Sequence, residues 1–309
     1  MSFVGHPFEL DSADIKTEFW RGVEDETEYW KAVAPWTIPS DRESETYRWL
    51  RQLPMLEKWT NLAGIPEALT GKESYTRINE DFGLNFTVTD KDVRRDKTKM
   101  YLTTARSVGQ GVNQRKNYEI ATLLEGADAD ELLFDAQYLY DDAHPGATAA
   151  GAATTFDNLR TGAYSTANLK ANISAMKKFR LPNGALCDPA GPSHIIIPTD
   201  LEWEVREDLE SRMRPDNANM ADNVVQGALD IIVLPHLSSA TAYYLVNLRR
   251  AYKPFFWQEE QALRFFEQQP GGTNPTQEWM TRRDYSFSVD HSGNFGVSYW
   301  WLTLKSTGA

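Results

Sequence analysis

The sequence predicts an α+β fold, and three observations lead to this class. An alternating strand pattern at residues 84–88 is followed by a long helical pattern at residues 100–125. Residues 164–250 alternate short apolar strands with helical patterns. Two segments near the C-terminus alternate apolar with polar side chains, which is typical of strands with one buried face. A chain that mixes these patterns is expected to combine sheets and helices around a shared core.

The strand at residues 84–88 and the helix after it are the element around which the chain is organised. Apolar side chains recur at helical spacing from Tyr101 onward, and Gly126 is expected to end the helix. At about 1.5 Å per residue this helix would be a rod of roughly 40 Å. Its middle, residues 110–117, is polar on all sides. We therefore expect this part to be solvated or covered by another chain.

The composition is that of an ordinary soluble protein. The chain has 309 residues, a formal net charge of -12, 41% hydrophobic and 25% charged residues. No apolar run approaches the roughly 18 residues that a membrane span needs, so no membrane contact is expected. The start of the sequence lacks a basic region followed by an apolar core, so we predict no secretion signal. The single Cys187 excludes an intrachain disulfide and fits a reducing cytosol.

Charge and aromatic content bear on the possible partners. The acidic balance argues against a nucleic-acid-binding protein. The ten Trp residues indicate either extensive interfaces or a Trp-rich core, and composition favours the core.

The N-terminal region is predicted to be a helix followed by an extended arm. The helix covers residues 11–31, and Pro35 and Pro39 break the chain after it. A partial helical stripe then precedes Pro54 and contains Tyr47, Trp49, Leu50 and Leu53. This region has too few apolar residues for a core of its own. It must therefore lie along the body of its own chain or along a neighbouring chain.

Residues 64–89 resemble a long hairpin. The candidate strands are residues 75–78 and 84–88, and residues 79–83 would form the turn. Both strands carry many polar side chains, and a two-stranded ribbon of this kind is marginal alone in water. We expect it to pack on another surface, and its edges favour pairing with another chain.

The middle of the chain is predicted to be a compact sub-domain. Residues 146–155 are rich in Ala, Gly and Thr and are interpreted as a flexible loop. Ser165 is expected to cap a helix, and a second helix is expected to begin at residue 199 or 200. Apolar strands are predicted at residues 193–198, 229–235 and 242–246.

The C-terminal region is predicted to be strands that pack on the long helix. Aromatic segments at residues 255–257 and 263–266 flank what we interpret as a charged turn. Residues 282–290 and 295–300 alternate strictly and are predicted to form a hairpin joined by residues 291–294.

The densest group of residues that could carry chemistry is Asp141, Asp142 and His144, with Asp135 upstream. A metal site or an acid–base pair is one interpretation, and side chains that close the turn before Pro145 are the other. The turn is favoured. The chain has no HExxH, CxxC, GxSxG or phosphate-loop motif. We therefore predict no enzyme, no cofactor and no metal site.

An ordered set of short motifs covers nearly the whole chain. The first is Tyr47-Arg48-Trp49-Leu50, followed by Gln52-Leu53-Pro54 and Trp59. The next are residues 75–92 and residues 138–145, which end in a DxHP motif. The last are Pro254-Phe255-Phe256, Arg283-Asp284-Tyr285, Val289-Asp290, Asn294-Phe295-Gly296 and Trp301. In this order the set resembles the major head subunits of phage Mu and Mu-like prophages: their N-terminal motif, their hairpin, their DxHP motif and their C-terminal strands.

The resemblance implies a major capsid protein of a tailed bacteriophage with the Hong Kong 97-type fold. The implied parts are an N-terminal arm (1–60), an extended-loop hairpin (61–92), a peripheral domain with a spine helix (93–163), an axial domain (164–250) and returning peripheral strands (251–309). Identical chains would form hexamers and pentamers of an icosahedral shell that encloses double-stranded DNA. The alternatives are a tail or baseplate protein and a soluble hydrolase that uses Asp141, Asp142 and His144.

The same resemblance implies where copies of the chain meet and what else they contact. The predicted inter-subunit residues are Trp49, Leu50, Leu53, Lys72, Tyr75 and Arg77. Some shells of this fold join Lys to Asn covalently. Nothing around Lys72 resembles the positioned carboxylate that this reaction needs, so noncovalent assembly is predicted.

Further partners follow from the implied role. The sequence shows no long charged helical prefix, so a separate scaffolding protein is expected, together with a portal and, as an option, a decoration protein. Packaged DNA should be contacted weakly and without sequence preference. The expected location is the virion capsid, after synthesis and assembly in the bacterial cytoplasm.

Overall fold

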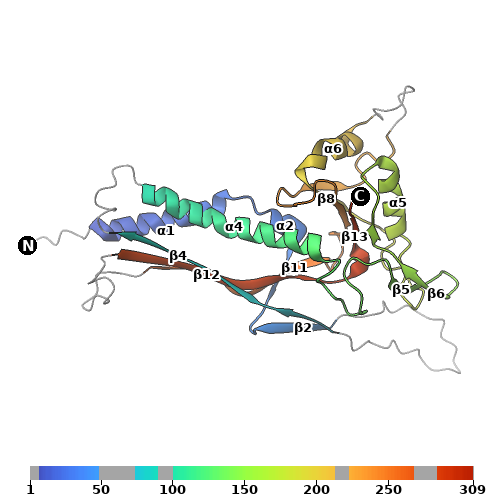
Figure 1. Ribbon diagram of the computed structural model, residues 1–309, viewed down its shortest axis with the longest axis horizontal. Coiled ribbons are helices and arrows are strands. Elements are labelled where there is room, and N and C mark those ends of the chain that lie inside the picture. The colour runs from blue at the N-terminus through green and yellow to red at the C-terminus, as the bar shows by residue number, and fades with distance from the viewer. Residues whose placement is uncertain (1–6, 49–73, 90–99, 213–222, 268–283, 309) are drawn as a thin grey trace, which may run out of the picture.

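A computed structural model describes residues 7–48, 74–89, 100–212, 223–267 and 284–308. The molecule has an elongated half and a compact half, which meet near the end of the longest helix (Figure 1). Among the described residues, the helices of the elongated half are α1 (Pro7–Asp25), α2 (Tyr29–Val33) and α4 (Met100–Gly126). They lie along a four-stranded sheet in the order β1-β11-β12-β4. Its strands are Trp36–Pro39, Phe255–Glu267, Asp284–Val297 and Glu80–Thr89.

The compact half is built on a five-stranded sheet in the order β7-β13-β10-β8-β9. Its strands are Leu159–Arg160, Thr303–Ser306, Tyr243–Val246, His194–Ile197 and Asp230–Val233. Helices α5 (Thr166–Met176) and α6 (Glu202–Glu210) lie beside it, with the short helices η1 (Thr199–Leu201) and η2 (Trp300–Leu302) (Figure 1). Two small ribbons complete the fold, β2 (Ser44–Arg48) with β3 (Ser74–Ile78), and β5 (His144–Ala147) with β6 (Ala153–Phe156).

Several predicted elements are confirmed. The long helix spans Met100–Gly126, within one residue of the predicted end. Ser165 caps α5 by accepting a hydrogen bond from the backbone N–H of Asn168 at 3.1 Å. The three apolar strands of the middle section are β8, β9 and β10. The C-terminal strands do pack on the long helix, because Tyr285 and Phe287 share a buried cluster with Tyr101.

The predicted hairpin at residues 75–88 is wrong. Only Asn79 separates β3 from β4, so the chain has no room to turn, and the two strands pair elsewhere. β3 runs antiparallel to β2, and β4 runs antiparallel to β12 over ten paired residues. Residues 44–48 are therefore a strand and not the start of a helical stripe; the rest of that stripe lies outside the described residues.

The predicted breaks near the C-terminus are also wrong. β11 and β12 are continuous strands of 13 and 14 residues. The charged segment interpreted as a turn, residues 258–261, stays in β11, where irregular register near Gln261 absorbs it. Along the rest of β11 half-buried and exposed positions alternate, and Glu260 and Arg264 occupy exposed positions, so the strand continues through its charged residues.

Two further differences concern the compact half. The expected flexible loop at residues 146–155 is largely the β5–β6 hairpin, closed by a hydrogen bond of 2.7 Å from Thr148 N–H to Ala152 O. The C-terminal strand β13 lies in the five-stranded sheet and not with β11 and β12. The last strand thus returns from the elongated half to the centre of the compact half.

The N-terminal region lies along its own chain in the described residues. It forms two helices and not one, and Ile15, Phe19 and Trp30 are almost fully buried. The sequence left open whether this region covers its own chain or a neighbour. Residues 13–47 lie against their own chain, because α1 packs along α4 and β1 pairs with β11.

Candidate functional site

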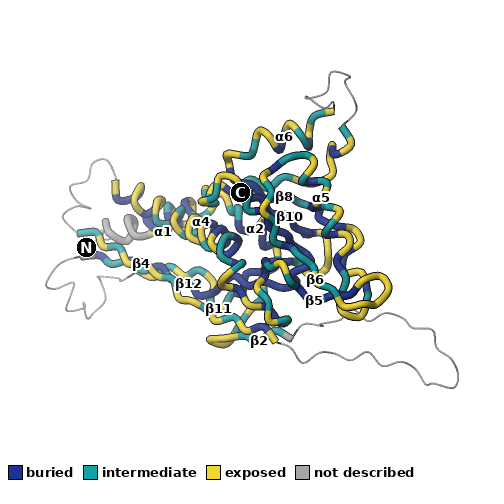
Figure 2. Tube along the Cα trace, turned by 45° about the vertical axis from the view of Figure 1, so that its right-hand side comes forward, coloured by how far each residue is buried: buried dark blue, intermediate teal, exposed yellow. Residues whose placement is uncertain are grey.

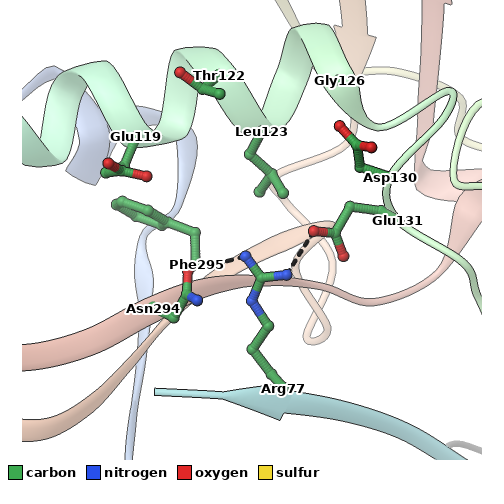
Figure 3. Close-up of a pocket in the computed structure, with 9 residues that line it drawn as sticks. All are labelled: Arg77, Glu119, Thr122, Leu123, Gly126, Asp130, Glu131, Asn294 and Phe295. Carbon is green, nitrogen blue, oxygen red and sulfur yellow. Dashed lines mark hydrogen bonds and ion pairs between the residues drawn. The ribbon is translucent and has the colours of Figure 1, made fainter. Parts of the chain in front are cut away.

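An ion pair that is largely buried anchors one side of the β2–β3 ribbon to the rest of the molecule. Arg77, in β3, places its Nη1 2.5 Å from Glu131 Oε1, and its Nη2 donates to Asn294 Oδ1 at 2.9 Å. Tyr75, two residues earlier on the same face of the strand, donates its hydroxyl to Glu131 Oε2 at 2.9 Å. Figure 3 shows Arg77 reaching from β3 toward Glu131, beyond the end of α4, and toward Asn294 on β12.

Solvent screens the Arg77–Glu131 ion pair only weakly, because little of either side chain is exposed. The side chains of Arg77 and Glu131 are 21% and 9% exposed. Burial raises the pKa of Tyr75, and the neighbouring Glu131 carboxylate raises it further, so the phenol stays protonated and donates. Burial alone would lower the pKa of Arg77, but its attraction to Tyr75 and Glu131 outweighs this and raises it. A cavity of about 110 Å³ lies beside these residues.

A second row of hydrogen bonds holds the other side of the ribbon. Tyr47, in β2, donates to Gln258 Oε1 at 2.6 Å, and Gln258 donates to Asn79 Oδ1 at 2.7 Å. Burial, with a contribution from Glu45, raises the pKa of Tyr47 to about 12. The Tyr47 ring also meets Phe256 edge-on at a centroid distance of 4.9 Å. The ribbon is thus fixed at its base, and residues 49–73, which connect its two strands, lie outside the described residues.

One face of the polar middle of the long helix is covered by its own chain. The expectation that residues 110–117 are solvated or covered by another chain is wrong for Asn113, Lys116 and Asn117, which are buried, whereas Gly111, Gln114 and Arg115 are exposed as expected. The Lys116 ammonium lies 5.0 Å from the ring centroid of Trp30 and 4.6 Å from that of Trp257. Asn117 donates to Thr27 O and accepts from Trp30 N–H, both within 2.9 Å. Burial lowers the pKa of Lys116, and the two indole rings stabilise its charged form.

Helices α1 and α4 approach each other at two glycines. A Cβ atom on Gly22 would lie 2.0 Å from the backbone oxygen of Arg106, and one on Gly109 would lie 2.1 Å from that of Phe19. No side chain fits at either position, so the two backbones touch directly. Asn113 then donates to Val23 O at 2.8 Å, which joins a polar face of α4 to α1. These contacts explain how a helix face without a clear apolar stripe is buried.

The cluster at Asp141, Asp142 and His144 is a folded turn, as the favoured interpretation predicted. Asp141 Oδ1 accepts from Ala143 N–H at 2.9 Å. His144 is fully buried, pairs with Asp135 at 2.8 Å and stacks on Trp300 at 4.2 Å between ring centroids. Because His144 and Asp135 are 0% and 2% exposed, they cannot meet a substrate in this structure. Among the described residues no three His, Cys, Asp or Glu side chains gather as a metal site.

The structure brings together two of the predicted inter-subunit residues. Tyr75 and Arg77 share Glu131 of their own chain, while Trp49, Leu50, Leu53 and Lys72 lie outside the described residues. A role of any of the six at a contact between copies stays a prediction. Glu131 and Asn294 were not predicted from the sequence as partners of this ribbon. The sequence indicated such partners only indirectly. Tyr75 and Arg77 lie on the same face of one strand, and polar side chains that become buried there need hydrogen-bond partners.

Comparison with known proteins identifies the family. The model of the Mu-like prophage major head subunit gpT family matches residues 10–167 and 238–309. The chain belongs to this family. It is a major head subunit, the major capsid protein of a tailed phage, as the sequence resemblance implied. No curated protein matches the chain. Over the described residues no helix has both the length and the apolarity to cross a bilayer.

Solved structures show the fold of this head subunit. The procapsid of bacteriophage JBD30 matches with a TM-score of 0.56 and 19% identity, over 97% of this chain and 75% of that chain. The virus-like particle from Pyrococcus furiosus matches with a TM-score of 0.53 and 10% identity, over 95% and 98% of the two chains. An empty GTA particle capsid matches with a TM-score of 0.56 and 10% identity, over 90% and 88%. The head subunit therefore has the Hong Kong 97-type capsid fold, as predicted.

Proposed function

We propose that this head subunit assembles into hexamers and pentamers of an icosahedral shell that encloses double-stranded DNA. The observation that carries the proposal is the likeness of nearly the whole chain to capsid subunits, together with its family. Closed shells need heterologous contacts that repeat around symmetry axes. An elongated half and a compact half offer different surfaces for such contacts (Figure 1).

The parts of the chain have separate roles in this proposal. Residues 1–60 act as the arm, 61–92 as the extended loop, 93–163 with 251–302 as the peripheral domain, and 164–250 with β13 (Thr303–Ser306) as the axial domain. The anchored β2–β3 ribbon supports the loop assignment, since Arg48 and Ser74 lie opposite each other at its end and residues 49–73 connect them. The capsid forms in the bacterial cytoplasm with a portal, a separate scaffolding protein and, as an option, a decoration protein.

Residues of the arm and of the extended loop contact a neighbouring copy in this proposal. An apolar groove of about 520 Å³ lies between α4 and β4, and its lining includes Phe82, Leu84, Val108 and Val112. We propose that Trp49, Leu50 and Leu53 of a neighbour pack against such apolar surface, and that Lys72, Tyr75 and Arg77 lie near the same contact. The contact is noncovalent, so boiled, denatured particles should give single chains and no ladder of multimers.

Imaging of the expressed protein tests this function. Negative-stain microscopy of the full chain should show closed shells, or rings of five and six subunits. Tubes would favour a tail protein, and a small uniform oligomer would overturn the capsid proposal.

DNA binding tests the proposed shell interior. Packaged DNA must slide during filling and ejection, so the inner face should be neutral to acidic. This agrees with the net charge of -12. A gel-shift titration of the unassembled protein should show no retention at about physiological salt. Salt-sensitive binding at micromolar protein would overturn the acidic interior and favour a basic lining.

A further inference from the structure

Charge is strongly segregated between two helices of the compact half. Between Asp157 and Asp188 the chain carries five basic residues and no acidic one: Arg160, Lys170, Lys177, Lys178 and Arg180. Residues 199–212 carry six acidic residues and two arginines. The first segment contains α5 and the second contains α6. Figure 1 shows α5 at the right-hand edge of the compact half and α6 at its top.

The basic residues of α5 face away from the core. Leu169, Asn172 and Met176 form the buried side of α5. Lys177 and Lys178, at its end, are exposed, and Lys170 is half-buried. Within the described part of the chain none of these three lysines pairs with a carboxylate. The end of α5 therefore presents uncompensated positive charge.

The acidic residues of α6 surround a large exposed aromatic side chain. Val205 and Leu209 form the buried side of the helix. Arg206 pairs with Glu202 at 2.9 Å and with Glu210 at 2.6 Å, whereas Glu204 and Glu207 are exposed and form no ion pair among the described residues. Trp203 is 74% exposed, although a Trp side chain gains much from burial.

The two charged faces cannot neutralise each other within one chain. Asp208 of α6 accepts hydrogen bonds from Tyr164 at 3.2 Å and from Thr166 at 2.8 Å, so α6 lies near the N-terminal end of α5. Lys177 is eleven residues further along, about 17 Å away at ~1.5 Å per residue. At this distance salt screens most of the attraction between exposed charges.

We propose that α6 of one subunit docks on the basic end of α5 of the next subunit, with Trp203 as its apolar anchor. The occupant of each face is thus a second copy of this chain, an inference that rests on the proposed capsid function. The contact is heterologous, so repeating it around an axis closes a ring. Opposite charges steer the two copies together and fix their orientation. A buried Trp near lysines supplies apolar area and a cation–π contact.

Charge reversal of the full chain tests the contact. Lys177→Glu with Lys178→Glu, or Glu204→Lys with Glu207→Lys, should lower the assembled fraction by about tenfold or more, because like charges then meet. Combining all four changes should restore assembly to within about threefold of the wild type, since complementary charges meet again. The assembled fraction is measured by sedimentation and negative-stain microscopy at one protein concentration.

A matched control separates a specific contact from net charge. Asp41→Lys with Glu43→Lys makes the same change in charge at exposed positions outside the compact half. Added to the two α5 reversals, it should not restore assembly. Restoration by this unmatched change, or full assembly of either double reversal, would overturn the proposed contact. If the wild-type chain itself makes no rings or shells, the proposed function fails, and the contact fails with it.

A second variant does not depend on charge. Trp203→Gln should leave the unassembled protein folded, with an unchanged circular dichroism spectrum, because the side chain is already exposed. It should lower the assembled fraction by about tenfold, as expected for a central aromatic anchor. A folded Trp203→Gln protein that assembles like the wild type would overturn the role of Trp203 and the proposed docking.

Discussion

The two halves of the molecule are held together by different means. In the compact half the central strand β10 is fully buried and belongs to the main apolar cluster. This cluster extends to the adjoining end of the elongated half, where it includes Leu124 and Phe256. Away from that junction, the described residues of the elongated half form a separate apolar cluster with five buried members: Ile15, Tyr101, Ala105, Tyr285 and Phe287. Figure 2 shows the same contrast, with buried segments gathered in the compact half and exposed segments along the helices and strands of the other.

A thin two-layer structure can thus be held together without a thick apolar core. Helices α1 and α4 touch through glycine backbones, and buried polar groups such as Asn113, Lys116 and Asn117 replace apolar side chains between the layers. At the junction of the halves, the Arg77–Glu131 pair ties the ribbon to both. We therefore expect the elongated half to be sensitive to single polar or glycine substitutions.

The largest effect is expected at the junction. Arg77→Met leaves the Glu131 carboxylate buried beside Tyr75 without its cation, which should destabilise the fold by about 3–5 kcal/mol. Adding Glu131→Gln removes the unpaired charge, so the double variant should be more stable than Arg77→Met alone. Urea unfolding of the unassembled protein measures both. Equal stability of the single and double variants would contradict a strong charge pair here.

A smaller effect is expected where the helices touch. Gly109→Ala places a Cβ about 2.1 Å from Phe19 O, and such overpacking should cost about 1–3 kcal/mol. The matched control is Gly111→Ala, two residues along, where the new Cβ would have no atom within 4 Å. This control should be neutral or stabilising by up to about 1 kcal/mol, because Ala favours a helix. The same urea measurement compares them, and equal losses would mean that backbone contact is not what joins α1 to α4.

The elongated half should also lose stability in acid. Burial and the nearby Lys116 lower the pKa of His291 from 6.5 to about 4. The unfolded chain then binds this proton more readily than the folded chain, so the stabilisation is complete above about pH 6.5 and is lost as the pH falls toward 4. We expect this residue to contribute about 1–3 kcal/mol to the difference between these limits. His291→Gln should show a weaker pH dependence of unfolding than the wild type; parallel pH profiles would contradict this.

The smallest expected effect concerns one hydrogen bond at the base of the ribbon. Tyr47→Phe removes the donor to Gln258 and keeps the ring against Phe256, which should cost about 1 kcal/mol. Tyr47→Ala removes the ring as well and should cost clearly more. Thermal unfolding measures the two variants, and a loss as large for Phe as for Ala would show that the hydroxyl and not the ring holds the ribbon.

Local patterns in the sequence were sufficient to predict those helices, caps and strands that can be recognised without knowing what they pack against. The spine helix, the Ser165 cap and the apolar strands β8, β9 and β10 follow from periodicity and capping, which depend on residues close in sequence. The family, too, was visible as ordered short motifs. In β11 and β12, polar and charged residues were interpreted as turns, although both strands are continuous. A strand with a solvent-facing side tolerates charged residues when it pairs with a neighbouring strand on each side, as β11 and β12 do.

Residue patterns alone were enough to predict the class, the spine helix, the capsid family and the turn at Asp141 to His144. The folded structure was needed to establish which strands pair: β3 with β2, β4 with β12, and β13 in the distant five-stranded sheet. It also decided that Glu131 neutralises Arg77 and that two tryptophans enclose Lys116. Lys116 lies 86 residues from Trp30 along the chain. Strand pairing and contacts of this kind depend on the packing energy between residues that are far apart in the sequence. A local sequence pattern contains no information about that energy.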